Sequence, residues 1–265
     1  MNDVLLLGVV VALGVIVAFY DVGSGTWRSF TPAAPGSLSA VSFNTGGLSD
    51  DGFRNASERS WYASLFSAAD IVALQELRGD ADGLRHSLRR AAPANHTVVL
   101  SEELGRTEYY TERYAFVVNT SYIQVGTSRI VVSVNDSVNR PPLALRFSHD
   151  NASFTAYNVH TDPETADEEI PRVATAVSDS VDNRSVVLGD FNADCDYYDP
   201  RPTVRGLHWV VGADADTTTS QTDCAYDRVL VDDAAQSAHR TSSVVDVPRW
   251  LSDHKPVRAT FGGGW

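Results

Sequence analysis

Short runs of β-branched and aromatic residues, each bounded by turn-forming residues, divide the sequence from residue 38 to residue 261. Such runs are typical of β-strands, and their close spacing favours sheets built from many short strands. The predicted strands lie at 38–44, 71–75, 97–100, 114–118, 130–134, 143–147, 154–158, 186–188, 226–231 and 257–261. At 265 residues the chain is long enough to bury these runs in one large core.

Three further segments place apolar side chains at the spacing of an amphipathic helix. Their apolar positions are Trp61, Leu65 and Ala69; Leu84 and Leu88; and Ile170, Val173, Val177 and Val181. Many short strands with few helices favour two packed mixed β-sheets flanked by helices, a four-layer α/β (α+β) sandwich, over a doubly wound parallel sheet. The GxGxxG and GxxxxGK[ST] phosphate loops are absent from the sequence, which argues against the usual nucleotide-cofactor enzymes.

Residues 4–20 form an uninterrupted run of apolar residues and glycine, close to the shortest length that spans a bilayer as a helix. We expect 1–22 to be a hydrophobic signal or anchor segment, 23–39 to be a Gly/Pro/Ser linker, and the folded domain to occupy 40–265. No basic stretch precedes the run and no clear cleavage site follows it. A cleaved leader and an uncleaved membrane anchor therefore both stay open, with the anchor slightly favoured.

The charge balance is strongly acidic, with 21 Lys and Arg against 34 Asp and Glu and a net charge of −13. This excludes a broad basic surface for nucleic acid, although a small basic cleft remains compatible with it. Lys255 is the only lysine, and Asp far outnumbers Glu. We interpret this composition as halophilic, and a GC-rich genome that favours Arg over Lys is the alternative.

Six of the 11 asparagines stand in Asn-x-Ser/Thr acceptors, whereas about two would be expected by chance. These acceptors predict a secreted or cell-surface glycoprotein. The two cysteines, Cys195 and Cys224, could form a disulfide in such an exported chain. The acceptor asparagines are Asn55, Asn95, Asn119, Asn135, Asn151 and Asn183.

Polar side chains stand at or beside the ends of six predicted strands. They are Asn44, Glu76, His160, Asp190 with Asn192, Asp227, and Asp253 with His254. Each alone would more often be a turn or structural residue, but strand ends are rigid supports on which side chains can converge. Carboxylate and amide oxygens suit Mg²⁺, and histidines transfer protons near neutral pH. Together they indicate metal-assisted phosphoester hydrolysis.

The strings LQEL, GDFNADC, CAYDR and LSDHKPV resemble the endonuclease/exonuclease/phosphatase superfamily, and more closely its DNase I branch. Order and spacing match from residue 41 to residue 261. The QE and SDH elements are shared with abasic-site endonucleases, sphingomyelinases and inositol phosphatases, whereas GDFNADC, CAYDR and GRTEYYTERY are typical of the DNase I branch. The resemblance implies that Cys195 and Cys224 form a disulfide.

Two kinds of metal site are implied by the resemblance. Glu76 and Asn44, with Asp253, would bind a catalytic Mg²⁺ or Mn²⁺ beside the scissile phosphate. The loop closed by the cysteines would bind a structural Ca²⁺, although a threonine-rich turn is also an ordinary loop. The alternating calcium positions are Asp216, Thr218, Ser220 and Thr222.

The resemblance also implies the catalytic roles. His160 and His254 would flank the phosphate, with Glu112 orienting His160 and Asp227 orienting His254. Which histidine is the acid stays open. The remaining pair, which would position the attacking water and bind phosphate oxygens, is Asp190 and Asn192.

The resemblance implies that Arg78 and Tyr110 contact DNA in the minor groove and that Arg140 contacts a phosphate. The alternatives are that Arg78 is an ordinary surface arginine and Tyr110 an ordinary loop aromatic. Minor-groove contact of this kind reads groove width more than base identity. The leading hypothesis is a monomeric, metal-dependent extracellular endonuclease that cleaves double-stranded DNA with little sequence specificity and leaves 5′-phosphate ends. The alternatives are a phosphodiesterase or sphingomyelinase-like hydrolase of the same fold, and an inactive surface binding module.

Overall fold

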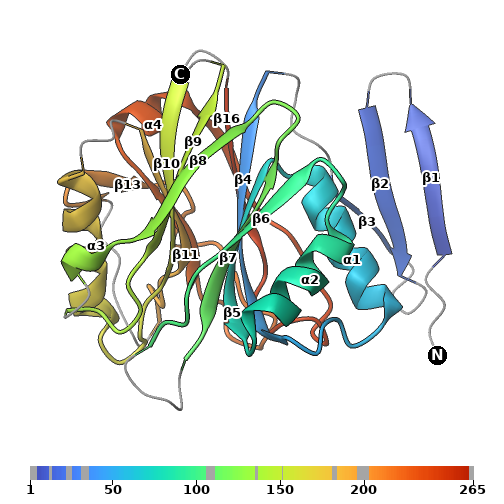
Figure 1. The fold of residues 1–265 in the computed structure, drawn as a ribbon, viewed down its shortest axis with the longest axis horizontal. Helices are drawn as coiled ribbons and strands as arrows, with labels where there is room; N and C mark the ends of the chain where they lie inside the picture. Colours follow the sequence, from blue (N-terminus) through green and yellow to red (C-terminus); the bar gives the residue numbers. More distant parts are fainter. Residues whose placement is uncertain are drawn as a thin grey trace.

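The computed structural model describes residues 36–105, 111–134, 137–150, 152–180, 184–195 and 203–262, together with the backbone of three N-terminal strands. Two mixed β-sheets pack face to face, and helices cover their outer faces (Figure 1). The sequence-based prediction of a two-sheet sandwich flanked by helices is therefore confirmed.

The first sheet has six strands in the order β15-β16-β4-β5-β7-β6. Only β4 and β5 run parallel, and the other neighbours are antiparallel. Helices α1 (Ala56–Ala68) and α2 (Ala81–Ala91) cover its outer face (Figure 1). The strands are β4 (Leu38–Ser49), β5 (Ile71–Arg78), β6 (His96–Leu100), β7 (Arg113–Asn119), β15 (His239–Val244) and β16 (Val257–Phe261).

The second sheet has seven strands in the order β12-β13-β14-β11-β10-β9-β8, with β10 and β11 parallel. Helix α3 (Ala166–Ser178) covers its outer face, and the short α4 (Asp233–Ala238) follows β14 (Figure 1). The strands are β8 (Gln124–Ile130), β9 (Leu143–His149), β10 (Ala152–His160), β11 (Ser185–Asp190), β12 (Thr203–Val204), β13 (Leu207–Trp209) and β14 (Asp227–Val231).

The central strands are apolar on both faces because each sheet is covered on both sides. In β5, Ile71 and Ala73 face the core between the sheets, while Val72 and Leu74 face α1 and α2. Continuous apolar runs are typical of strands buried on two sides. The same rule explains β11, where Val187 packs under α3.

Most predicted strands and all three predicted helices are present, with boundaries shifted by a few residues; Val181 lies outside the described residues. The strand predicted at 130–134 is wrong. The chain forms β8 up to Ile130 and then a 3₁₀ turn, Val132–Val134. Because β8 is largely exposed, its sequence lacks the apolar alternation that would have revealed it.

The N-terminal apolar run forms strands, not a helix. Strands β1 (Leu5–Val11), β2 (Gly14–Asp21) and β3 (Thr26–Phe30) form a separate antiparallel sheet (Figure 1). The six valines and two glycines of this run disfavour a helix. No helix within the described residues is long and apolar enough to cross a membrane. The leader or anchor role of 1–22, the linker at 23–39 and the domain start at residue 40 stay predictions, and β4 already begins at Leu38.

Candidate active site

Strand pairing brings the predicted catalytic residues to one edge of the sandwich. In the seven-stranded sheet His160 lies opposite Asp190, and Asp190 lies opposite Asp227. In the six-stranded sheet Asn44 lies opposite Gln75, next to Glu76. Because parallel strands end at the same edge, residues far apart in the sequence become neighbours without long flexible loops.

Asp190 is the centre of this cluster and is only 1% exposed. Its Oδ2 atom lies 3.5 Å from His160 Nε2 and 3.6 Å from His254 Nε2, and it accepts a hydrogen bond from Asn44 Nδ2 at 2.9 Å. The backbone N–H of Asn192 donates to the other carboxylate oxygen, Oδ1, at 3.0 Å. Burial raises the pKa of this carboxyl, but the two histidines and the Asn donors outweigh it and lower the pKa. Asp190 is therefore ionised at neutral pH.

Each histidine bonds a second carboxylate through its far ring nitrogen. His160 Nδ1 lies 3.1 and 3.0 Å from the two Glu112 oxygens, and His254 Nδ1 lies 2.7 Å from Asp227 Oδ2. Burial disfavours both charged imidazoles, but Glu112 raises the pKa of His160, and Asp227 with Asp190 raises that of His254 well above its usual value. Burial raises the pKa of Asp227 to about 6. The paired carboxylates thus favour the protonated form of both imidazoles.

Glu76 and Asn44 adjoin this cluster at the end of the parallel β4/β5 pair. Glu76 has a φ of 57°, a conformation that most residues avoid and that here turns it out of the regular strand path. The Asn44 amide donates to Glu76 Oε1 at 3.2 Å. Asp253 is exposed, and its Oδ1 atom lies 3.5 Å from the hydroxyl of Ser252, which donates to the Asn44 carbonyl at 2.9 Å. The structure therefore brings the three predicted catalytic-metal ligands into one region.

A second group could also hold an ion. Ligand atoms of Asp190, Asp227 and His254 lie within 4.8 Å of one another. The resemblance had implied acid, base or orienting roles for these residues, and no role in metal binding. Carboxylate oxygens here and at Glu76 are hard donors of the type that Mg²⁺ and Mn²⁺ prefer, so the site's chemistry fits a divalent cation.

Asn192 and Arg140 fix the strand that carries His160. Asn192, at a φ of 46°, donates to the Thr161 carbonyl at 2.9 Å. Arg140 is buried, and its Nε lies 3.9 Å from Glu112. It donates from Nε to the His160 carbonyl and from Nη2 to the Thr161 carbonyl, both at 3.0 Å. The structure thus places Arg140 beneath the site as a support, where the sequence predicted a contact with DNA phosphate. That contact stays a prediction.

The predicted minor-groove residues are placed only in part. The Arg78 side chain is 61% exposed, and its Nη2 donates to Glu76 Oε2 at 3.1 Å. An exposed guanidinium therefore stands at the rim of the catalytic cluster. Tyr110 lies outside the described residues.

A buried pair of amides under the site was missed from the sequence. Gln75 donates to the Asn158 side chain at 2.7 Å, and Asn158 donates to the carbonyls of Leu74 and Ala115, both at 3.0 Å. These bonds join β5 and β7 of one sheet to β10 of the other. The signal was present in the string AYNVH, where one amide interrupts an apolar strand.

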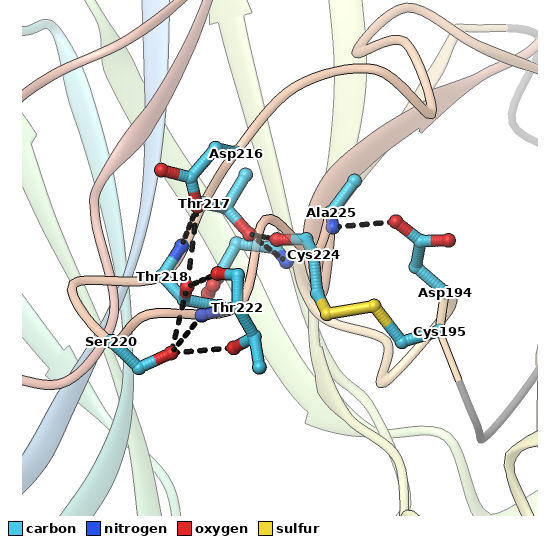
Figure 2. Close-up of a disulfide and its surroundings, with 10 residues drawn as sticks. Asp194, Cys195, Asp216, Thr217, Thr218, Ser220, Thr222, Cys224 and Ala225 are labelled. Carbon is cyan, nitrogen blue, oxygen red and sulfur yellow. Dashed lines mark hydrogen bonds between the residues drawn. A yellow bond between two sulfur atoms is a disulfide. The ribbon is translucent and has the colours of Figure 1, made fainter.

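The two cysteines form the implied disulfide between Cys195 and Cys224 (Figure 2). Beside it, the four predicted calcium positions lie in one turn, and their oxygens bond one another. The Asp216 carboxylate also pairs with the Lys255 ammonium group. The calcium site stays a prediction, and nothing in the sequence indicated the lysine contact.

A two-sheet sandwich with His–carboxylate pairs converging on a buried aspartate defines a phosphoester hydrolase. The Endonuclease/Exonuclease/phosphatase family matches residues 41–254, and the chain belongs to this family.

Within the family, the chain belongs to the DNase I branch. "Deoxyribonuclease-1" of Sus scrofa is 30% identical over 263 residues, which cover 85% of this chain and 92% of that protein. "Deoxyribonuclease-1-like 2" of Mus musculus is 28% identical over 251 residues, covering 83% and 90%. In fold, D. rerio TDP2 complexed with single strand DNA product has a TM-score of 0.59 and 15% identity, with 85% of this chain and 99% of that chain covered.

Proposed function

We propose that this protein is a divalent-metal-dependent endonuclease that hydrolyses phosphodiester bonds of double-stranded DNA. The observation that carries the proposal is the position of the Asp190 carboxylate between the Nε2 atoms of His160 and His254. Two imidazoles on either side of one ionised carboxylate match the needs of phosphodiester hydrolysis, in which one proton is taken from water and another is given to the leaving oxygen.

In the proposed reaction, Asp190 orients a water molecule and accepts its proton. The water oxygen forms a bond to phosphorus while the bond from phosphorus to the 3′-oxygen breaks. One imidazolium donates its proton to that 3′-oxygen, and the other binds a phosphate oxygen. The products are a 3′-hydroxyl and a 5′-phosphate end.

A divalent ion held by Glu76 and Asn44, with Asp253, would neutralise phosphate charge. Arg78 donates a hydrogen bond to Glu76 at 3.1 Å, and its side chain is 61% exposed. This guanidinium would enter the minor groove of a bound duplex. Contact of this kind depends on groove shape, so cleavage would be nearly independent of sequence.

Double-stranded DNA is favoured over a small phosphodiester by two observations. The two curated relatives described above are both named deoxyribonucleases, and an exposed arginine stands at the rim of the proposed catalytic cluster. A disulfide and the six glycan acceptors favour a secreted or surface-anchored enzyme. Asn135, Asn151 and Asn183 lie outside the described residues. We further propose that the enzyme acts as a monomer.

The test is cleavage of supercoiled plasmid by the purified protein with Mg²⁺, with Mn²⁺ and with a chelator. We expect nicked circles with either metal and intact plasmid with the chelator. Sphingomyelin and bis(p-nitrophenyl) phosphate are offered in parallel. Rapid turnover of either small substrate with intact plasmid would replace the endonuclease proposal by the phosphodiesterase alternative.

A further inference from the structure

Lys255, the only lysine in the sequence, is directed at the loop closed by the disulfide. Its side chain is only 16% exposed, and its Nζ pairs with Asp216 Oδ2. A second carboxylate, Asp246, lies 3.9 Å from the same nitrogen. Holding a long flexible side chain in one conformation costs entropy. The contacts with the two carboxylates offset this cost and fix the position of the ammonium group.

Both oxygens of Asp216 are already engaged. Oδ1 accepts from the Thr218 amide at 3.0 Å and from the Thr218 hydroxyl at 3.2 Å, and Oδ2 accepts from Lys255. Partial burial raises the pKa of the Asp216 carboxyl, but the Lys255 and Thr218 donors outweigh it and lower the pKa. The single carboxylate among the four loop positions is therefore ionised and paired with a cation.

The other loop oxygens satisfy one another (Figure 2). The Thr218 hydroxyl, whose one hydrogen is shared between Asp216 and the Thr222 carbonyl, lies 3.2 Å from the Ser220 hydroxyl, which bonds the Thr222 hydroxyl in turn. These are neutral groups, and affinity for Ca²⁺ depends strongly on the number of charged ligands. With Lys255 balancing Asp216, the four positions and the lysine carry no net negative charge. The residues therefore do not fit the structural calcium ion that the resemblance implied.

The backbone places this contact beside the catalytic pair. The Lys255 amide donates to the Thr217 carbonyl at 2.7 Å, and the Thr219 amide donates to the Asp253 carbonyl at 2.8 Å. The Thr217 hydroxyl accepts from the Asp227 amide at 3.0 Å. The loop thus supports the backbone of Asp227 and adjoins the segment just before β16, which carries His254. A cation that fixes the loop therefore also helps to hold Asp227 and His254 in place.

We propose that Lys255 is a built-in cation that holds the disulfide loop in the place of a structural calcium ion. The ammonium group neutralises Asp216, and Arg249 adds a second cationic donor to the Thr219 carbonyl. The loop then keeps its conformation in the absence of calcium. This inference concerns stability, so it does not depend on the nuclease proposal.

The experiment measures thermal unfolding of the full chain by circular dichroism with Ca²⁺ or with a calcium-selective chelator, at fixed Mg²⁺ in both arms. We expect the same midpoint for the wild-type protein in both arms. Lys255→Met should lower the midpoint by about 3 °C or more, and Ca²⁺ should recover part of that loss because Asp216 is then free to bind it. Lys255→Arg keeps the charge and should melt closer to the wild type.

Arg129→Met is the matched control, because it removes one positive charge from an exposed position on β8. The proposal is overturned if Lys255→Met melts like this control. It is also overturned if Ca²⁺ raises the wild-type midpoint by several degrees and Asp216→Asn abolishes that rise. Should Lys255→Met fail to fold, the wild-type and Asp216→Asn arms still decide the question.

Discussion

The Nε2 atom of His160 lies 3.5 Å from Oδ2 of Asp190, its direct partner across the parallel strands β10 and β11. Shifting either strand by one residue would move that strand's side chain to the opposite face of the sheet and separate His160 from Asp190. The cluster is therefore a property of strand register, which the buried cores on both faces of these strands enforce.

The ion pair of His254 and Asp227 should stabilise the fold more at low pH than at high pH. Because the folded pKa of His254 is raised, the stabilisation is fully present below the unfolded pKa of about 6.5 and is lost as pH rises through the folded pKa. We expect Asp227→Asn to lower the free energy of unfolding more at roughly pH 6.5 than at roughly pH 10, measured by urea denaturation.

Asp233→Asn is the control for this comparison, because Asp233 pairs with His208 while its own side chain is largely exposed. Its cost should be small at both pH values. An equal cost of Asp227→Asn at the two pH values would show that the His254 pair is not the source of the stabilisation.

The buried amide pair should matter for stability as well as for activity. Asn158→Ala removes the donors to two backbone carbonyls and one of the two acceptors of the Gln75 side-chain amide, which keeps its bond to Ser42. We expect a loss of about 2–4 kcal/mol in the free energy of unfolding, since several buried polar groups lose their partners. Asn95→Ala, at an exposed amide, should cost much less. Similar urea midpoints for the two variants would refute this role.

The disulfide should stabilise the chain by restricting its unfolded state. The cysteines are 29 residues apart, and closing a loop of this size is worth about 3 kcal/mol. We expect the Cys195→Ser/Cys224→Ser variant to unfold at lower urea concentration, with a steeper transition because its unfolded chain is less compact. Free thiols found by mass spectrometry of the unreduced wild-type protein would contradict the prediction.

The acidic composition leads to a prediction about salt. A net charge of −13 repels DNA at low ionic strength, and added salt screens this repulsion. We expect maximal plasmid cleavage at molar salt and loss of folded structure in dilute buffer. Cleavage assays and circular dichroism across a NaCl series measure the two effects. A stable fold with maximal activity in dilute buffer would assign the composition to codon usage.

The sequence was sufficient to predict the sandwich, and it singled out polar residues that the fold brings together at one edge. Apolar runs such as 71–75 mark strands covered on both faces, and polar residues such as Asp190 mark where those strands end. The sequence did not predict β8, whose side chains are largely exposed. It also did not reveal that Arg140 is buried or that Lys255 reaches Asp216. Those contacts depend on side-chain directions in loops, which no local pattern specifies.

The most direct test of the account is single-turnover cleavage of a DNA duplex by Asp190→Asn, an isosteric change at the centre of the cluster. Asp179→Asn, at the exposed end of α3, serves as the control. We predict that Asp190→Asn lowers the rate about 100-fold to 10,000-fold while circular dichroism stays unchanged, and that Asp179→Asn cleaves like the wild type. Wild-type cleavage by a folded Asp190→Asn protein would contradict the central claim that this carboxylate, between His160 and His254, carries the reaction.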